Sequence, residues 1–172
     1  AIARALATLV PGDHRGVMLT TPSGVTILDD SDNYTQHALT RVLDALGASH
    51  PTGRRIAVLG EMLELGDQAV ALHEACGRHA VTAGVQRLVT VGGEPARRLG
   101  TAAVAAGLPA AQVTHTATSD EAAAVLAGML DGLEHGGDPG PPVVGNAYEQ
   151  TEARALFWRD TINDFMASGF IK

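Results

Sequence analysis

The sequence is poor in cysteine, in aromatic residues and in basic charge, and each shortage excludes something. A single cysteine, Cys76, rules out an internal disulfide and fits a buried small hydrophobic residue better than a reactive thiol. Aromatic residues make up only 3% of the chain, so the core must be built from Ala, Val and Leu. The formal net charge of -7, with no basic patch, argues against non-specific binding to nucleic acid or to an anionic membrane.

Long apolar runs and several catalytic motifs are also missing. No uncharged apolar segment reaches the roughly 18 residues of a membrane-spanning helix, so we expect a cytoplasmic protein. The chain has no G-x-x-x-x-G-K-[ST] loop, no G-x-G-x-x-G after a strand, no C-x-x-C pair and no G-x-S-x-G elbow. Gly92-Gly93-Glu94 follows an apolar segment, but a lone glycine pair is weak evidence for a phosphate site. A self-sufficient nucleotide-hydrolysing enzyme is therefore not expected.

Hydrophobic periodicity predicts an α/β fold. Residues 17–21 and 24–28 have the pattern of a hairpin, and residues 35–46 have apolar side chains at helical spacing. Short strands predicted at 56–59, 88–91 and 113–116 then alternate with helices predicted at 67–84, 95–106 and 119–133. This alternation indicates βαβ units and a largely parallel sheet. A last short strand is predicted at 143–145, and further helices at 1–9 and 151–166.

Two adjacent carboxylates, Asp29 and Asp30, follow the strand predicted at 24–28. Carboxylates at the carboxyl end of a strand, just before a helix, are where α/β proteins hold ribose hydroxyls and other polar ligands. The alternative is structural, because Asp, Ser and Asn before a helix also satisfy its free N–H groups. We interpret the Asp pair as part of a site, whereas Ser31 and Asn33 taken alone favour capping.

A second acidic strand end follows at Glu61 and Glu64, after the strand predicted at 56–59. We expect the two acidic strand ends to lie at neighbouring positions, which suggests one composite site. A solvated loop charge is the alternative for each glutamate. Further candidates are His73 in the next predicted helix and Arg15 before the hairpin, although a helical histidine is more often structural and a lone arginine is usually solvated.

Taken together, these segments resemble the C-terminal domain of the Mur ligase family. The resemblance rests on an arginine before a hairpin, on D-D-S-x-N at 29–33, on V-L-G-[DE]-M-x-E-L-G at 58–66, and on a histidine seven residues later. It covers residues 1–135, and its middle motif is long and specific. The implied fold is a Rossmann-like, mostly parallel sheet with helices on both faces and an N-terminal β-hairpin.

The resemblance also implies a three-domain, ATP-dependent amide-bond ligase. Residues 1–12 would end the central domain and its linker, and residues 13–172 would form the C-terminal domain. The central domain would make most of the contacts to ATP and Mg²⁺ and would activate a carboxylate as an acyl phosphate. The C-terminal domain would close over the nucleotide and present the amine. The implied partners are ATP, a small amine substrate and the preceding central and N-terminal ligase domains, with no nucleic acid and no membrane.

The same resemblance assigns roles to individual residues. Nucleotide binding falls to Arg15, Asp30 and Asn33. The residues implied in substrate binding are Asp29, Ser31, Asp32, Glu61, Glu64, His73 and Asn146. No catalytic residue or metal ligand is implied within this chain, so we expect no ligation from it alone.

The sequence departs from the family pattern at two places. Asp32 stands where the family commonly has Tyr, and an Asn-Pro pair soon after Asn33 is absent. The segment 144–147, V-G-N-A, stands near the position of a Lys-Gly-Ser-Arg motif, so two cations suited to a carboxylate or phosphate are missing. Either the amine substrate differs or the ligase activity is weakened, and we favour a divergent ligase. The alternatives are a non-catalytic nucleotide- or ligand-binding module and a structural domain that contacts a protein partner.

Overall fold

The structure is a computed structural model that describes residues 16–20, 25–31, 35–48, 54–134 and 143–146. The helices predicted at 1–9 and 151–166, and the domain boundary predicted between residues 12 and 13, lie outside these ranges. None of the helices in the described ranges combines the length and the apolar character that a bilayer-spanning helix needs.

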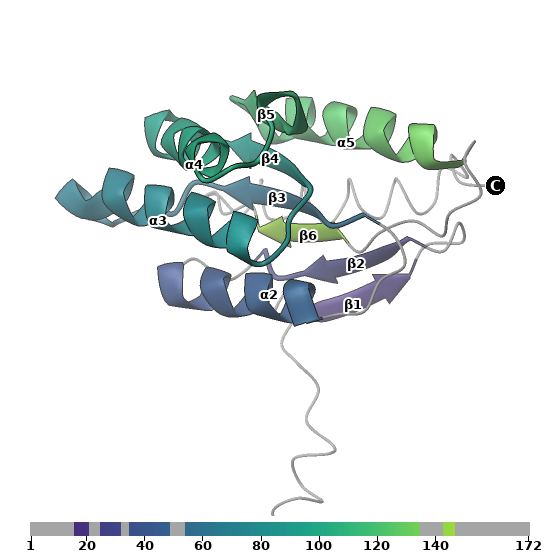
Figure 1. Cartoon of the computed structure of the whole chain (residues 1–172), viewed down its shortest axis with the longest axis horizontal. Coiled ribbons are helices and arrows are strands. Elements are labelled where there is room, and N and C mark those ends of the chain that lie inside the picture. The colour runs from purple at the N-terminus through teal and green to yellow at the C-terminus, as the bar shows by residue number, and fades with distance from the viewer. Residues whose placement is uncertain (1–15, 21–24, 32–34, 49–53, 135–142, 147–172) are drawn as a thin grey trace, which may run out of the picture.

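The described strands form one six-stranded sheet in the order β1-β2-β6-β3-β4-β5 (Figure 1). β1 (Val17–Thr20) and β2 (Thr26–Asp29) pair antiparallel, which confirms the predicted hairpin. The remaining strands run parallel to β2, and they are β3 (Ile56–Gly60), β4 (Arg87–Val91), β5 (Val113–Thr116) and β6 (Val143–Asn146). The prediction of a mostly parallel sheet with an N-terminal hairpin is therefore confirmed.

The last strand, β6, lies between β2 and β3, and this corrects the expectation that the two acidic strands are neighbours. Val144 of β6 is paired with Leu28 of β2 on one side and with Ala57 of β3 on the other. The connection from β2 to β3 therefore skips one strand position, which the chain fills only at its end. Local periodicity cannot reveal such a pairing, because it depends on residues more than 80 positions apart.

Within the described ranges, four helices connect the parallel strands. They are α2 (Gln36–Ala48), α3 (Ala69–Thr82), α4 (Glu94–Ala105) and α5 (Ser119–Glu134). Short 3-10 turns precede α3 at Gly66–Gln68 and β5 at Ala110–Gln112. The segment predicted as one helix at 67–84 thus begins with a 3-10 turn. Pro95 lies in the first turn of α4, where a missing backbone N–H has no helical partner to lose.

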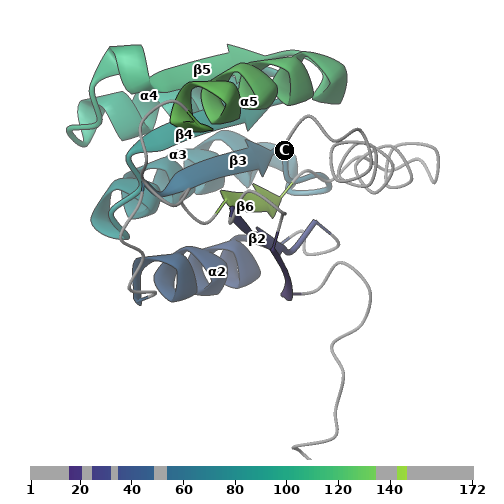
Figure 2. The same cartoon turned by 90° about the vertical axis from the view of Figure 1, so that its right-hand side faces the viewer.

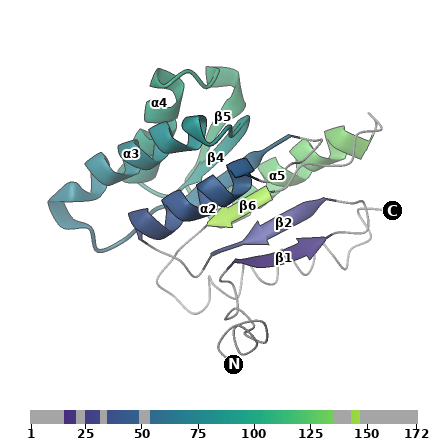
Figure 3. The same ribbon diagram turned by 60° about the horizontal axis from the view of Figure 1, so that its bottom comes forward.

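The helices cover both faces of the sheet, as predicted. α2, α3 and α4 pack on one face, which includes Ala57 and Leu59, whereas α5 packs through Ala122 on the opposite face, which includes Ile56 and Val58. Figure 2 shows α5 in front of β4 and β5 with α3 behind β3, and Figure 3 shows α2 and α3 running side by side. Because side chains alternate along a strand, the continuous apolar run of β3 fits a strand buried on both faces.

The core formed by the described residues is aliphatic, but all six aromatic residues of the chain lie outside the described ranges, so the predicted absence of aromatic side chains from the core stays a prediction. Among the described residues, the buried hydrophobic side chains are those of Ala, Val, Leu, Ile, Met and Cys. Cys76 of α3 belongs to the cluster under α2, α3 and α4, and burial raises the pKa of its thiol to about 11. Cys76 therefore stays protonated near neutral pH, which agrees with a structural role.

Candidate functional site

Five parallel strands of the described sheet end at the same edge, and the acidic residues predicted for the site follow two of them. In the register, Asp29 of β2 and Val58 of β3 are both paired with Gly145 of β6. Asp30 and Glu61 therefore leave the sheet at one edge, with the axes of β2 and β3 about 10 Å apart across β6. The two acidic segments share an edge, as predicted, but not adjacent strands.

Asp29 forms a local turn with Ser31. Oδ1 of Asp29 accepts hydrogen bonds from the Ser31 backbone N–H at 3.1 Å and from the Ser31 hydroxyl at 2.7 Å. An aspartate that binds the backbone two residues ahead makes an Asx turn, so this pair shapes the loop after β2. Capping of α2 involves Thr35 instead, whose Oγ1 accepts a hydrogen bond from the Ala38 N–H at 3.1 Å. Substrate contact by Asp29 and Ser31 stays a prediction.

Asp30 is buried at the carboxyl end of β2, with 2% of its surface exposed. Burying a carboxylate costs several kcal/mol of desolvation unless polar or charged groups offset that cost. Asp30 is therefore not simply a loop carboxylate exposed to solvent. The end of a parallel strand is also the position that α/β proteins use for hydroxyl-bearing ligands. Asp30 therefore remains the central candidate of the site.

Four other predicted residues fall wholly or partly outside the description. Arg15, Asp32 and Asn33 lie outside the described residues. Asn146 is the last residue of β6, and its backbone is paired with that of Leu59. The structure describes the backbone of Asn146 but not its side chain. Since β6 runs between β2 and β3, the Asn146 backbone reaches the same edge as the acidic residues. The roles assigned to these four residues stay predictions.

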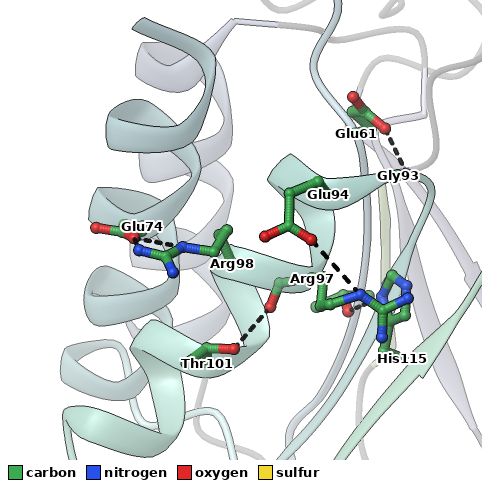
Figure 4. Close-up of polar contacts among 9 residues, drawn as sticks. Glu61, Glu74, Gly93, Glu94, Arg97, Arg98, Thr101 and His115 are labelled. Atoms are coloured by element: carbon green, nitrogen blue, oxygen red, sulfur yellow. Dashed lines mark hydrogen bonds and ion pairs between the residues drawn. The ribbon is translucent and has the colours of Figure 1, made fainter.

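Glu61 bridges from β3 to the turn between β4 and α4. Its Oε2 accepts a hydrogen bond from the Gly93 N–H at 2.6 Å (Figure 4). Gly93 immediately precedes α4, so the carboxylate lies at a helix N-terminus, where free N–H groups and the helix dipole favour negative charge. β4 flanks β3 on the side away from β2, so this carboxylate does not join Asp30 in one cluster. Substrate contact by Glu61 stays a prediction, whereas its bond to Gly93 is observed.

His73 holds the loop after β3 against α3. Its Nε2 accepts a hydrogen bond from the Met62 N–H at 2.8 Å, and its Nδ1 lies 2.7 Å from the Ala69 carbonyl oxygen. These two partners define a neutral ring that carries its proton on Nδ1. Burial is the main cause that lowers the pKa of His73, although the Ala69 hydrogen bond and the charge of Glu61 act in the opposite direction.

Both ring nitrogens of His73 are thus engaged within the protein, and its side chain is 0% exposed. The prediction that His73 binds substrate directly therefore needs correction. The family motif identifies the position of this histidine in the sequence. The spacing of the motif does not show that the imidazole ring accepts a hydrogen bond from the backbone of Met62. In the structure His73 supports the loop from within.

Glu64 lies exposed in the same loop with an unusual backbone. Its φ of 60° is in the left-handed region, which costs a residue with a Cβ about 1–2 kcal/mol. The loop is held on either side of it by Met62, which is buried in the core, and by Leu65, which packs against that core. Strained backbone that persists between fixed anchors is often found at functional sites. The substrate role predicted for Glu64 is compatible with this position and stays a prediction.

Replacement of Gly92 by alanine tests how closely Glu61 packs on the turn. Gly92 and Gly107 have φ values of 128° and 113°, so alanine strains the backbone at either position, by about 1–3 kcal/mol. At Gly92 the added Cβ would also lie 2.8 Å from Glu61 Cβ, whereas nothing lies within 4 Å at Gly107. We expect Gly92→Ala to lower the free energy of unfolding by about 1–3 kcal/mol more than Gly107→Ala in urea denaturation. Equal losses would contradict the tight Glu61 contact.

The N-terminus of α5 is closed by another internal carboxylate. Glu121 Oε2 accepts hydrogen bonds from the backbone N–H groups of Ala117 at 2.9 Å and Thr118 at 3.4 Å. Thr118 Oγ1 in turn accepts a hydrogen bond from the Glu121 N–H at 3.3 Å, as in a capping box. With Glu61 at α4, the helix N-termini that follow β4 and β5 both hold a carboxylate of the chain itself. An anionic ligand bound there would have to displace one of them.

A polar pair between β4 and β5 was not apparent from the sequence. Thr90 Oγ1 lies 3.0 Å from His115 Nδ1, and Arg97 of α4 reaches toward this histidine while pairing with Glu94 at 3.7 Å (Figure 4). Burial and then the charge of Arg97 lower the pKa of His115, whereas Glu94 and Glu121 raise it. The pair links β4 to β5, and the charge of Arg97 in α4 acts on it. No sequence motif marks it, because the two residues meet only through the strand register.

Within the described ranges, no group of three or more His, Cys, Asp or Glu side chains is arranged to hold a metal ion. Mg²⁺ ordinarily uses carboxylate oxygens together with substrate phosphates and water. The described part of the chain does not supply a complete set of such ligands by itself. The Mg²⁺ predicted for the central domain stays a prediction.

Comparison with known protein sequences identifies relatives. The family described as "Mur ligase, glutamate ligase domain" matches residues 14–133. The UDP-N-acetylmuramoyl-tripeptide–D-alanyl-D-alanine ligase of Mycobacterium tuberculosis is 44% identical over 96 residues, which are 53% of this chain and 19% of that protein. The ligase of the same name from Bacillus subtilis is 29% identical over 90 residues, 52% of this chain and 20% of that protein. The chain thus spans about a fifth of the length of these curated relatives.

Solved structures share the fold. MurF from Acinetobacter baumannii matches with a TM-score of 0.74 at 19% identity, over 96% of this chain and 33% of that one. MurF from Thermotoga maritima in complex with ADP matches with a TM-score of 0.64 at 19% identity, over 96% of this chain and 35% of that one. The family match extends from the N-terminal hairpin into α5 and includes the D-D-S and V-L-G-E-M-L-E-L-G segments. This chain therefore belongs to the Mur ligase family, and its residues 14–133 carry the domain that the family model describes.

Proposed function

We propose that this chain is the C-terminal domain of a MurF-like ligase, the part that contacts ATP and presents an amine to an activated carboxylate. The family match over residues 14–133 carries this proposal. The whole protein would join an amino acid or dipeptide to a carboxylate through an acyl phosphate, in peptidoglycan precursor synthesis or in a divergent relative of that pathway. We expect this reaction in the cytoplasm, where ATP is present.

The arrangement of internal carboxylates supports placing the nucleotide at the β2 and β6 end of the sheet edge. Glu61 and Glu121 already occupy the N-termini of α4 and α5. Asp30, at the end of β2, lies outside that half of the edge and is the buried carboxylate best placed to accept hydrogen bonds from ribose hydroxyls. The similarity to a ligase crystallised with ADP is consistent with nucleotide binding in this fold. Arg15 and Asn33 would complete the nucleotide contacts.

The proposed division of labour follows from the chemistry of an acyl phosphate. Such an intermediate must be kept from water, and closure of one domain over another achieves this while bringing the amine into line. The phosphate charge would be met by Mg²⁺ and by cations of the central domain, because this chain has no phosphate-binding loop. This chain would contribute shielding, ribose contacts and the amine site, so alone it should not ligate.

Asp30→Ala should weaken ATP use by the intact ligase more than it weakens the fold. Loss of a charged acceptor for ribose hydroxyls is worth about 1.5–3 kcal/mol, which corresponds to a KM for ATP raised by about 10- to 100-fold. The measurement is phosphate release as a function of ATP concentration, together with the melting temperature. Asp120→Ala removes an exposed carboxylate in the first turn of α5 and serves as the control. An unchanged KM for ATP with a normal melting temperature would remove Asp30 from the site.

An acceptor screen with the intact protein separates this proposal from its alternative. The alternative is a non-catalytic nucleotide- or ligand-binding module, which is favoured by the missing Lys-Gly-Ser-Arg segment near Asn146. A ligase should release phosphate from ATP in the presence of a particular amino acid or dipeptide. Nucleotide binding without acceptor-dependent phosphate release across the screen would favour the module. A divergent acceptor would appear as release with an amine other than D-alanyl-D-alanine.

A further inference from the structure

We propose that Glu61 and His73 are positioning residues that together fix the loop at residues 61–65 for the amine acceptor. This inference rests on the proposed ligase function, but the geometry that carries it is independent of that function. The loop leaves β3 at the edge where the acidic residues lie and leads through the 3-10 turn Gly66–Gln68 into α3. We call residues 61–65 the clamped loop.

The clamped loop is fastened at its start by two hydrogen bonds to two different elements. The first residue, Glu61, binds the Gly93 N–H at the start of α4 at 2.6 Å. The second residue, Met62, donates its backbone N–H to His73 of α3 at 2.8 Å. Because consecutive residues are tied to different helices, the loop cannot shift with one helix without breaking its bond to the other.

Packing reinforces both hydrogen bonds. The Met62 side chain is 3% exposed and lies in the core cluster, and Leu65 packs on the same cluster. On the other side, Gly92 and Gly93 leave room for the Glu61 side chain, since a Cβ at Gly93 would lie 3.0 Å from Glu61 Oε2. Gly92 and Gly93, which are weak evidence for a phosphate site in the sequence, therefore accommodate the carboxylate of Glu61 within the protein.

The clamp keeps Glu64 exposed in its left-handed conformation at the sheet edge. A loop that was free to relax would release this strain, which is worth about 1–2 kcal/mol. In the proposed ligase this loop would face the amine, and displacement of a reactant by about 1 Å can lower the rate of a reaction by about 100-fold. Glu61 and His73 act on the acceptor through the loop and need not touch it.

Paired substitutions in the intact ligase test this role. Glu61→Ala and His73→Ala remove the acceptors for the Gly93 and Met62 N–H groups, whereas Glu61→Gln and His73→Gln each retain a neutral acceptor of similar reach. We expect the alanine variants to raise the KM for the amine by about tenfold or more, with the KM for ATP nearly unchanged. The glutamine variants should recover most of the loss. Equal changes in both KM values, or no rescue by glutamine, would overturn the positioning role.

Glu121→Ala is the matched control, because it removes the carboxylate at the N-terminus of α5 but leaves the clamped loop intact. It should lower stability about as Glu61→Ala does without changing the KM for the amine. Amide hydrogen exchange supplies a readout that does not need ligation. Glu61→Ala should speed exchange at Gly93, and His73→Ala at Met62. Unchanged exchange rates would refute the two hydrogen bonds that hold the clamped loop. Faster exchange in a protein that ligates no amine would leave these hydrogen bonds in place. It would refute the proposed ligase function, and with it the role of the loop in positioning the amine.

Discussion

Gly77→Ala should destabilise the fold by about 3 kcal/mol or more, a large loss for one methyl group. Gly77 lies in α3 where α4 crosses it, and a Cβ there would overlap the Leu99 carbonyl oxygen and lie 3.2 Å from the Ala103 backbone nitrogen. These are atoms of the helix backbone, so no side-chain rotation relieves the clash. The two helices must move apart, which opens the core cluster beneath them. Urea denaturation followed by circular dichroism measures the loss.

Gly128→Ala provides the matched control for this substitution. Gly128 lies exposed in α5, and nothing lies within 4 Å of a Cβ added there. Alanine should therefore stabilise α5 by up to about 1 kcal/mol, since glycine is the poorer helix former. Opposite signs for the two glycine replacements are the expected result. If Gly77→Ala were as stable as the unsubstituted chain, the close approach of α3 and α4 would be wrong.

The fold was predicted wherever neighbouring residues determine the structure. The apolar run of β3 and the alternation of strands with helices follow from local periodicity, and the observed elements agree closely. The place of β6 could not be predicted, because its partners in β2 and β3 lie far away in the sequence. The close approach at Gly77 was equally hidden, since a helical glycine gives no sign of which backbone it will meet.

The candidate site was predicted in part for the same reason. An apolar strand that ends in Asp29 and Asp30 predicts that these two carboxylates lie at the edge where the strand ends. The structure places both residues at that edge. The direction of the Glu61 side chain depends on Gly93, which lies 32 residues further along the chain, before α4. The inward orientation of His73 depends on the backbone of Met62, whose position is set by the conformation of the loop after β3. The capping box at α5 was not predicted, although the pattern T-x-x-E before an apolar segment is a signal that could have identified it. Residue type and spacing thus located the loops but not the contacts within them.

His73 should make stability fall as the pH is lowered through the mildly acidic range. Burial keeps the pKa of His73 below its ordinary value of about 6.5, so the unfolded chain takes up this proton at a higher pH than the folded chain. The stabilising effect is therefore complete above about pH 6.5 and is lost as the pH falls through the depressed pKa of the folded state. Protonation of Nε2 removes the acceptor for the Met62 N–H, and the loss approaches about 1.4 kcal/mol per pH unit within that window.

His73→Gln isolates this contribution, because glutamine can accept the Met62 hydrogen bond but does not titrate. The unsubstituted chain should lose stability between pH 7.5 and pH 5.5, values about one unit on either side of the ordinary histidine pKa, and the variant should lose distinctly less. His115 contributes in the same direction in both proteins, so the difference between the two profiles belongs to His73. If the profile of His73→Gln runs parallel to that of the unsubstituted chain, His73 does not hold its loop as a neutral acceptor.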